Sequence, residues 1–245
     1  MKMNGFYKYK NIEFSKPAAI RDAQEIILKN HLYYIFNNSP YYRRVLNGID
    51  LNKITLKNLS SLPFTDKSAF ENHNNELLAV PASEIVDIVL SSGTTGQPTK
   101  IMYTENDLKR LAYNEELSFA GCGINSDDTV LLTCTMDRCF IAGLAYYLGI
   151  RALGAAAVRN GLNSFESHME IINRLKPTAI VGVPSFLHKL GLFLQSKGIE
   201  PRKTNITKLV CIGEPLRDRD LSLLKMGGYL EEIWGAKVFS TYASS

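Results

Sequence analysis

Apolar residues recur at the spacing of one helical face in the first third of the chain. They do so between Pro17 and about Asn37, and proline is well suited to the first turn of a helix. The segment Asn38-Ser39-Pro40 would end this helix. Three shorter helical stretches are expected further on: around residues 41–44, at 56–59 after a threonine, and after residue 66. We therefore expect a helical, loop-rich region over residues 1–83.

The pattern changes at Glu84, where short β-branched and apolar runs begin to alternate with stretches of helical period. The runs expected to be strands are residues 85–90, 129–133, 155–158, 179–183, 209–212 and 238–241. The stretches expected to be helices are residues 104–120, 140–153, 164–175, 184–197 and 218–225. Such alternation is typical of a mostly parallel sheet with helices on both faces. The sequence thus predicts an α/β fold, with a mostly parallel β-sheet flanked by helices, over residues 84–245.

A loop rich in hydroxyl groups and glycine follows the first predicted strand, which we expect to be buried. Its sequence is Ser91-Ser92-Gly93-Thr94-Thr95-Gly96-Gln97-Pro98-Thr99-Lys100. Glycine lets backbone N–H groups approach an anion, hydroxyls donate hydrogen bonds to phosphate oxygens, and Lys100 adds a positive charge. At the carboxyl end of a strand in an open sheet, this composition predicts a phosphate-binding loop. It is not the P-loop of NTPases, which needs glycine where Pro98 stands, and no G-x-G-x-x-G fingerprint occurs.

Composition narrows the choice of partners. The chain has 245 residues, 45% hydrophobic and 21% charged, which is ordinary for a globular protein. Its net charge of +4 is too small and too dispersed to indicate nucleic acid as a partner. The most apolar run, residues 140–150, is shorter than the roughly 20 residues that span a bilayer, and the first ten residues do not resemble an export signal. We expect no membrane partner and a cytoplasmic location, and we leave the oligomeric state open.

The four cysteines, Cys122, Cys134, Cys139 and Cys211, have apolar or partly apolar neighbours in the sequence. We expect all four to be buried, free thiols. The spacing of Cys134 and Cys139 matches no common zinc pattern, so we expect this pair to be reduced and metal-free. A metal site completed by residues beyond position 245 is left open.

The glycine- and hydroxyl-rich loop resembles the phosphate-binding motif of the adenylate-forming (AMP-forming) synthetases, and the chain is most similar to the phenylacetate–CoA ligase family. Further segments that resemble motifs of that family, in order, are Pro40-Tyr41-Tyr42-Arg43-Arg44, Leu62-Pro63-Phe64-Thr65-Asp66-Lys67, Val183-Pro184-Ser185-Phe186-Leu187, Gly213-Glu214-Pro215-Leu216 and Ser240-Thr241-Tyr242-Ala243-Ser244-Ser245. The resemblance extends over nearly the whole chain. It implies the N-terminal domain of an adenylate-forming enzyme, truncated before the rest of the large domain and the C-terminal domain.

The resemblance also implies a reaction, with ATP, Mg²⁺ and coenzyme A. A carboxylic acid, aryl or acyl, would be activated as an acyl-adenylate and then transferred to coenzyme A. Thr94 would hold a phosphate and Mg²⁺, Lys100 would lie near the phosphates, and Phe140 would line the acyl pocket. The residues implied in nucleotide binding are Ser91, Ser92, Gly93, Thr94, Thr95, Gly96, Gly213, Glu214, Pro215, Tyr242, Ala243, Ser244 and Ser245. Tyr242 could instead be an ordinary buried aromatic and Glu214 a solvated loop acid, while Phe140 fits the core as well as it fits the pocket.

Several features depart from the family pattern. Thr99 separates Pro98 from Lys100, Ala243 replaces the usual glycine, and residues 136–139 lack the aromatic, glycine-rich character of the family's acyl pocket. Phenylacetate itself is therefore not predicted as the substrate. Two other functions fit the same motifs: a module that binds ATP or AMP without catalysis, and an adenylating enzyme that passes its acyl group to a carrier protein. We expect this chain alone not to make acyl-CoA, because the family's next glutamate and its C-terminal lysine are absent from the sequence.

Overall fold

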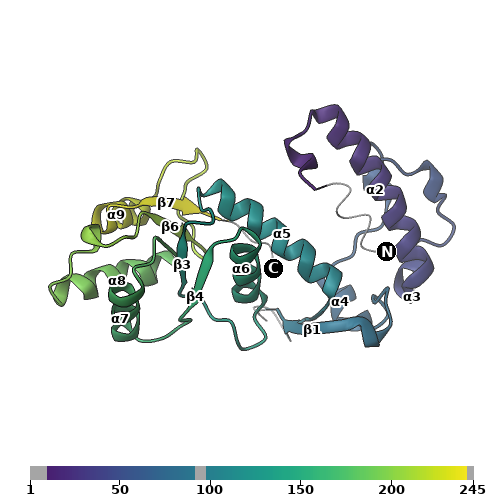
Figure 1. Cartoon of the computed structure of the whole chain (residues 1–245). Helices are drawn as coiled ribbons and strands as arrows, with labels where there is room; N and C mark the ends of the chain where they lie inside the picture. Colours follow the sequence, from purple (N-terminus) through teal and green to yellow (C-terminus); the bar gives the residue numbers. More distant parts are fainter. Residues whose placement is uncertain (1–9, 92–97, 242–245) are drawn as a thin grey trace. The chain divides into compact units, whose positions relative to one another are not determined.

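The structure is a computed structural model, which describes residues 10–91 and 98–241 (Figure 1). Its contacts divide the chain into two compact units, Met1–Asp107 and Leu108–Ser245, which are described separately below. The division into a helical region, residues 1–83, and a nucleotide-binding region, residues 84–245, stays a prediction. Within the described residues, no helix combines the length and the apolar character needed to cross a bilayer.

The first unit begins with helices. They are α2 (Pro17–Asn38), α3 (Pro40–Val45) and α4 (Lys67–His73), with short 3-10 helices η1 (Ile12–Phe14), η2 (Leu51–Lys53), η3 (Leu59–Ser61) and η4 (Ala82–Glu84). The helix predicted from Pro17 is confirmed, and so are the helices near residue 41 and after residue 66. The α-helix predicted at 56–59 is wrong, because residues 56–58 form a turn and Leu59 begins η3.

Polar side chains cap these helices, and apolar side chains pack them together. The Ser39 hydroxyl accepts from the backbone N–H of Tyr42 at 3.3 Å, and the Asp66 carboxylate accepts from that of Ala69 at 2.9 Å. Each cap satisfies a backbone donor that has no partner inside its helix. A small core joins α2 to the segment that follows α3 and consists of Leu32, Leu46, Leu51 and Ile54.

A β-hairpin follows these helices. Strands β1 (Ile85–Leu90) and β2 (Lys100–Thr104) pair antiparallel and form a two-stranded sheet of their own. The strand at 85–90 is confirmed, but the prediction that it is buried and belongs to a parallel sheet is wrong. Val89 is buried, whereas Val86, Ile88 and Leu90 are exposed. A β-branched run favours a strand without specifying its partner, and sequence reasoning missed β2 altogether.

The second unit contains a five-stranded parallel sheet with the order β4-β3-β5-β6-β7. Its strands are β3 (Thr129–Leu132), β4 (Ala156–Arg159), β5 (Ala179–Gly182), β6 (Lys208–Cys211) and β7 (Lys237–Ser240). The other elements are α6 (Ile141–Ala152), α7 (Phe165–Leu175), α8 (Pro184–Ser196), η5 (Pro201–Lys203) and α9 (Lys225–Trp234), while α5 (Glu105–Gly121) spans the boundary between the units. The predicted α/β fold with a parallel sheet is confirmed.

Helices cover both faces of this sheet (Figure 1). Side chains alternate along each strand, so Leu131 and Ile180 face a core shared with α7, α8 and α9. Val130 and Val181 face the opposite core, which includes Phe119 of α5 and residues of α6. The apolar runs of β3, β5 and β6 are therefore continuous because these central strands are buried on both faces, whereas the outer strands β4 and β7 have exposed residues.

Helices α5 and α6 pack closely at Gly149. A Cβ atom at this position would lie 2.3 Å from Glu115 Cβ and 2.8 Å from the backbone carbon of Glu115. Only glycine leaves room for the neighbouring backbone here. Burial raises the pKa of the Glu115 carboxyl at this interface.

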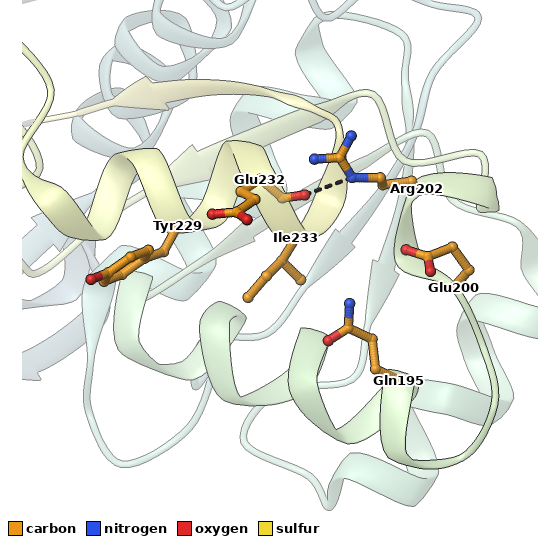
Figure 2. A pocket seen from close by; sticks show the side chains of 6 residues that line it. All are labelled: Gln195, Glu200, Arg202, Tyr229, Glu232 and Ile233. Atoms are coloured by element: carbon orange, nitrogen blue, oxygen red, sulfur yellow. Dashed lines mark hydrogen bonds between the residues drawn. The ribbon is translucent and has the colours of Figure 1, made fainter.

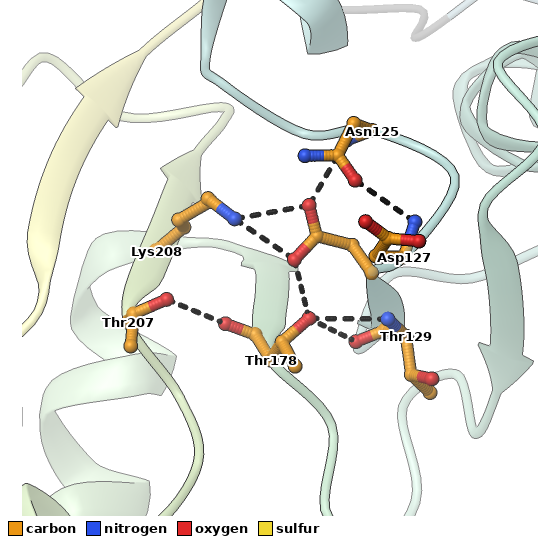
Figure 3. A network of polar contacts seen from close by, with 7 residues as sticks. Asn125, Asp127, Thr129, Thr178, Thr207 and Lys208 are labelled. Atoms are coloured by element: carbon orange, nitrogen blue, oxygen red, sulfur yellow. Dashed lines mark hydrogen bonds and ion pairs between the residues drawn. The ribbon is translucent and has the colours of Figure 1, made fainter.

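A network of polar contacts connects the amino ends of β3, β5 and β6 (Figure 3). The Lys208 ammonium lies 2.8 Å and 2.9 Å from the two carboxylate oxygens of Asp128, and the Thr178 hydroxyl donates to the same carboxylate at 2.6 Å. The backbone N–H of Asn125 also donates to it, at 2.9 Å. Burial raises the pKa of Asp128, but the hydrogen bonds from Lys208, Thr178 and Asn125 outweigh burial and lower it overall. The network therefore joins β3, β5 and β6 at the edge where those strands begin.

Two further predictions are corrected in this unit. Residues 218–225 do not form a helix: the Asp220 carboxylate accepts from the backbone and hydroxyl of Ser222, and Leu221 has φ +66°. Such a local turn competes with a helix, which starts instead at Lys225 and was missed. All four cysteines are free thiols, but Cys139 is exposed rather than buried.

Candidate functional site

The loops that follow the parallel strands meet at one edge of the sheet, where the strands end. The chain leaves β3 toward β4 and leaves β5 toward β6, which lie on opposite sides of the β3–β5 pair. In open α/β sheets, ligands bind outside the carboxyl ends of the strands at such a reversal. This edge is therefore where the fold of the second unit favours a ligand site.

The carboxyl ends of β3 and β5 are hydrogen-bonded to each other and closely packed. The backbone N–H and the hydroxyl of Thr133 both donate to the carbonyl of Val181, at 3.0 Å and 2.9 Å. A Cβ atom on Gly182 would lie 2.2 Å from the Thr133 hydroxyl oxygen, so the junction requires glycine at this position. Both strand ends are thus fixed before their loops turn away.

The loop after β6 is held by a carboxylate. Glu214 accepts from the backbone N–H of Ser185 at 3.0 Å and from the Ser185 hydroxyl at 2.6 Å. Ser185 lies in the first turn of α8, where a negative charge is favourable. Glu214 is half-buried, so the solvated loop acid considered from the sequence is wrong. Burial and the nearby charge of Glu214 raise the pKa of the Cys211 thiol to about 12.

The residues around Glu214 leave the loop open toward solvent. Gly213 has φ +75°, a conformation that favours glycine, and both Gly213 and Pro215 are exposed. Leu216 is 1% exposed and anchors the other end of the loop in the core. The loop is therefore fixed on one side while its backbone remains accessible.

The two ends of the predicted phosphate loop lie in the first unit, where two hydrogen bonds connect Ser91 to Thr99. The backbone N–H of Ser91 donates to the carbonyl of Thr99 at 2.9 Å, and the backbone N–H of Thr99 donates to the Ser91 hydroxyl at 3.0 Å. The loop thus connects two antiparallel strands, and its predicted place at the carboxyl end of a strand in the parallel sheet is wrong. Ser92, Gly93, Thr94, Thr95 and Gly96 lie outside the described residues.

Lys100 begins strand β2 and has partners within the first unit. Its ammonium donates to the side chain of Asn75 at 3.0 Å, and its carbonyl accepts from the side chain of Asn74 at 2.7 Å. An ammonium has three donors, so the hydrogen bond to Asn75 is compatible with the predicted contact of Lys100 with phosphate, which stays a prediction. Tyr242, Ala243, Ser244 and Ser245 lie outside the described residues, so their predicted roles stay predictions.

A hollow of about 490 Å³ lies at the ends of β3 and β4, and we call it the β3–β4 hollow. It is lined by residues 135–138, which follow β3, and by residues 159–163, which end β4 and follow it. Phe140, predicted to line the acyl pocket, is 45% exposed, directly precedes α6 and is not among the described residues that line this hollow. Sequence reasoning did not select Arg159 or Asn160, because nothing in the sequence pairs the β3 and β4 loops.

A second hollow, of about 440 Å³, lies among α8, η5 and α9 (Figure 2). Arg202 Nε donates to the backbone oxygen of Glu232 at 2.6 Å across it, and Gln195, Glu200, Tyr229 and Ile233 complete its lining. None of the described residues predicted to bind nucleotide lines this hollow.

The sequence matches known proteins along most of its length. The AMP-binding enzyme family model matches residues 42–237, and the chain belongs to this family. Phenylacetate-coenzyme A ligase of Thermus thermophilus is 32% identical over 200 residues, which are 80% of this chain and 45% of that protein. The enzyme of the same name from Pseudomonas putida is 28% identical over 84% of this chain and 48% of its own length. The chain thus spans about half the length of the curated relatives that it matches.

The fold also matches solved structures. A crystal structure of 2-hydroxyisobutyryl-CoA ligase in complex with 2-HIB-AMP and CoA superposes with a TM-score of 0.82 and 23% identity, over 92% of this chain and 49% of that chain. An open conformation of the same ligase gives a TM-score of 0.81. At this level of identity the likeness establishes the fold. The resemblance to AMP-forming ligases that the motifs indicated is confirmed by the family match.

Proposed function

We propose that this chain forms the nucleotide-binding part of an enzyme that activates a carboxylic acid with ATP, releases pyrophosphate, and transfers the acyl group from the acyl-adenylate to coenzyme A. Membership of the AMP-binding enzyme family supports the nucleotide. The curated relatives, named phenylacetate-coenzyme A ligases, support the acid and the thiol. The proposal covers both aryl and alkyl acids, and the exchange experiment below distinguishes them.

The observation that carries the proposal is the bond between Glu214 and Ser185. It fixes Gly213 and Pro215 at the carboxyl edge of the sheet while leaving both exposed. A loop held this way can present backbone groups to the edge of adenine without rearranging when the base binds, which lowers the entropic cost of binding. Both carboxylate oxygens of Glu214 accept from Ser185, so the proposed role of Glu214 in nucleotide binding is to hold the loop in place.

For this reaction the protein must mainly position the two reactants and supply positive charge near the phosphates. The acid's carboxylate must approach the α-phosphate in line, and the charge that gathers on the phosphates must be offset. We assign phosphate binding to Thr94 and Thr95, with Lys100 adding a positive charge near the phosphates. Mg²⁺, when bound, would offset phosphate charge next to Thr94. Tyr242 would stack on adenine.

Isothermal titration with ATP tests the nucleotide assignment. Gly93→Val should abolish binding, because a side chain there blocks the approach of backbone N–H groups to the phosphates. Thr94→Val keeps the shape but removes a donor, and should weaken binding by about 1–3 kcal/mol. Gly228→Val, in an open position on α9, is the matched control and should bind like the wild type. Unchanged ATP affinity in a folded Gly93→Val protein would contradict the assignment.

Exchange of labelled pyrophosphate into ATP tests the activation step. Acid-dependent exchange reports formation of the acyl-adenylate, and a panel of aryl and alkyl acids would identify the substrate class. Adding coenzyme A, or a carrier protein in its place, then identifies the acceptor. ATP binding with no exchange for any acid would favour a nucleotide-binding role without catalysis.

A further inference from the structure

The β3–β4 hollow contains a positive charge that is held in place. Arg159 is the last residue of β4 and pairs with Leu132 of β3, which fixes its backbone. Its guanidinium carbon lies 4.9 Å from the centre of the Tyr147 ring, within the range of a cation–π contact. Tyr147 is itself half-buried on α6. Arg159 is exposed, and its contact with Tyr147 is what orients the guanidinium before any ligand arrives.

Among the described residues, no carboxylate forms an ion pair with Arg159. Asp137, the one carboxylate among the described residues that line the hollow, accepts a hydrogen bond from the Thr135 hydroxyl and lies 4.0 Å from Arg138 Nε. These contacts lower the pKa of Asp137, the hydrogen bond from Thr135 most of all. Asp137 is thus engaged on its own loop, and Arg159 is left to recognise an anion.

The wall beside Arg159 is rigid. The side-chain nitrogen of Asn160 lies 3.0 Å from Nδ1 of His168, and its side-chain oxygen accepts from the Ser167 hydroxyl at 3.2 Å. The backbone N–H groups of Asn160 and Gly161 both donate to the carbonyl of Leu132, at 3.2 Å and 3.1 Å. This part of the hollow therefore keeps its shape when empty.

His168 supports this wall from inside the fold. It is completely buried, and its ring meets Phe186 edge-on at 5.3 Å. Burial lowers the pKa of His168, partly offset by a hydrogen bond to the backbone of Gly161, and its Nδ1 lies within hydrogen-bond distance of the Asn160 side chain. Its role toward the hollow is to position Asn160.

We propose that the β3–β4 hollow binds a second carboxylate of the acid substrate, with Arg159 as the recognising charge, so that the preferred acids are dicarboxylic. This inference rests on the proposed function, because it assumes that an acid is the substrate. A guanidinium recognises a carboxylate through two parallel hydrogen bonds. The volume of about 490 Å³ lies within the range of small-molecule sites. Met136 and Leu162 supply apolar contacts for the hydrocarbon part of such an acid.

Benzoate and terephthalate, which differ by one carboxylate, test the proposal. Titrated into this chain and followed by calorimetry and by backbone amide NMR, terephthalate should bind at least about tenfold more tightly, as expected for one charge-assisted hydrogen-bonded contact. Its shifts should centre on residues 159–163. Arg159→Gln should remove the advantage. Arg174→Gln, which removes an exposed arginine paired with Glu170 on α7, should retain it. Equal affinity for the two acids, or a preference that survives Arg159→Gln, would overturn the proposal.

ATP titrated into the same samples separates this proposal from the proposed function. ATP binding without a preference for terephthalate overturns the dicarboxylate proposal and leaves the nucleotide assignment standing. A preference for terephthalate without ATP binding supports the hollow and contradicts the proposed function.

The positioning role of His168 has its own test. Asparagine places a hydrogen-bonding group near the former Nδ1, whereas leucine fills the space without one. Terephthalate affinity should therefore fall several-fold in His168→Leu and recover in His168→Asn, while benzoate affinity stays the same in both. Unfolding curves identify variants that are destabilised. Equal terephthalate affinity in folded His168→Leu would show that His168 is structural only.

Discussion

The carboxylate of Glu214 accepts two hydrogen bonds from Ser185, a residue 29 positions earlier in the chain. The bond joins the loop after β6 to the first turn of α8, which follows β5. Both residues belong to segments that resemble motifs of phenylacetate–CoA ligases, and the structure shows why a glutamate and a serine suit these places. Glu214 places a negative charge near the N-terminus of α8, and Ser185 provides two donors for this half-buried carboxylate.

Removing this bond should loosen the loop and weaken nucleotide binding. Glu214→Ala should lower the free energy of unfolding by about 1–3 kcal/mol, because the N–H and hydroxyl of Ser185 lose their acceptor. Ser185→Ala should cost about 1 kcal/mol, and the double variant should cost less than the sum, since both changes remove one contact. Urea unfolding and ATP titration measure the two effects. Glu231→Gln, an exposed acid on α9, is the control, and strictly additive losses would contradict the coupling.

Two glycines on helices should respond in opposite directions to alanine. Gly149→Ala places a methyl group 2.3 Å from Glu115 Cβ, and should destabilise the protein by about 1–3 kcal/mol through overpacking. Gly228→Ala meets no atom within 4 Å and should stabilise α9 by about 0.5–1 kcal/mol, because alanine favours a helix. Thermal unfolding of the two variants gives the comparison. A stabilised Gly149→Ala would mean that α5 and α6 are less closely packed than described.

The network at Asp128 should make stability depend on pH at the acid end. Because the folded-state pKa of Asp128 is lowered, its contribution is complete above the ordinary pKa of the carboxyl and is lost as pH falls through the lower folded value. Asp128→Asn should cost about 1–3 kcal/mol near neutral pH, and this difference from the wild type should shrink on acidification. Urea unfolding over a series of pH values checks both points. Asp127→Asn, an exposed neighbour, should leave the wild-type profile unchanged, and a constant cost of Asp128→Asn down to low pH would refute the account.

The four thiols should differ in reactivity. Burial raises the pKa of Cys122 and of Cys134 to about 11 and, with the charge of Glu214, that of Cys211 to about 12, so these thiols are both shielded and protonated near neutral pH. Cys139 is exposed. A disulfide reagent should modify one thiol quickly in the folded protein and the other three on unfolding. Cys139→Ser should abolish the fast reaction and Cys122→Ser should not; fast modification of all four would contradict the burial described here.

Much of the fold follows from the sequence, because the central strands of the parallel sheet are apolar on both faces and each strand is separated from the next by a helix. The five strands from β3 to β7 and most of their helices were predicted on this ground. The hairpin strand at Ile85–Leu90 has the same composition, yet it pairs with Lys100–Thr104 and exposes alternate residues. Composition favours an extended backbone and does not name the partner strand. The turn at residues 218–223 escaped prediction because side-chain hydrogen bonds within it outcompete a helix.

The residues of the candidate site also fall into two groups: those that the sequence indicates and those that only the tertiary structure brings together. The sequence by itself determined the glycine- and hydroxyl-rich loop and the Gly213–Pro215 segment, since these depend on residue types within a few positions. Only the tertiary structure decided that Glu214 meets Ser185, that His168 meets Asn160, and that Arg159 shares a hollow with the loop after β3. Those pairs depend on strand order and on register, such as Gly182 beside Cys211 and Leu132 beside Arg159. Register is set by the packing of both faces of the sheet together, and that information is spread over the whole second unit of the chain.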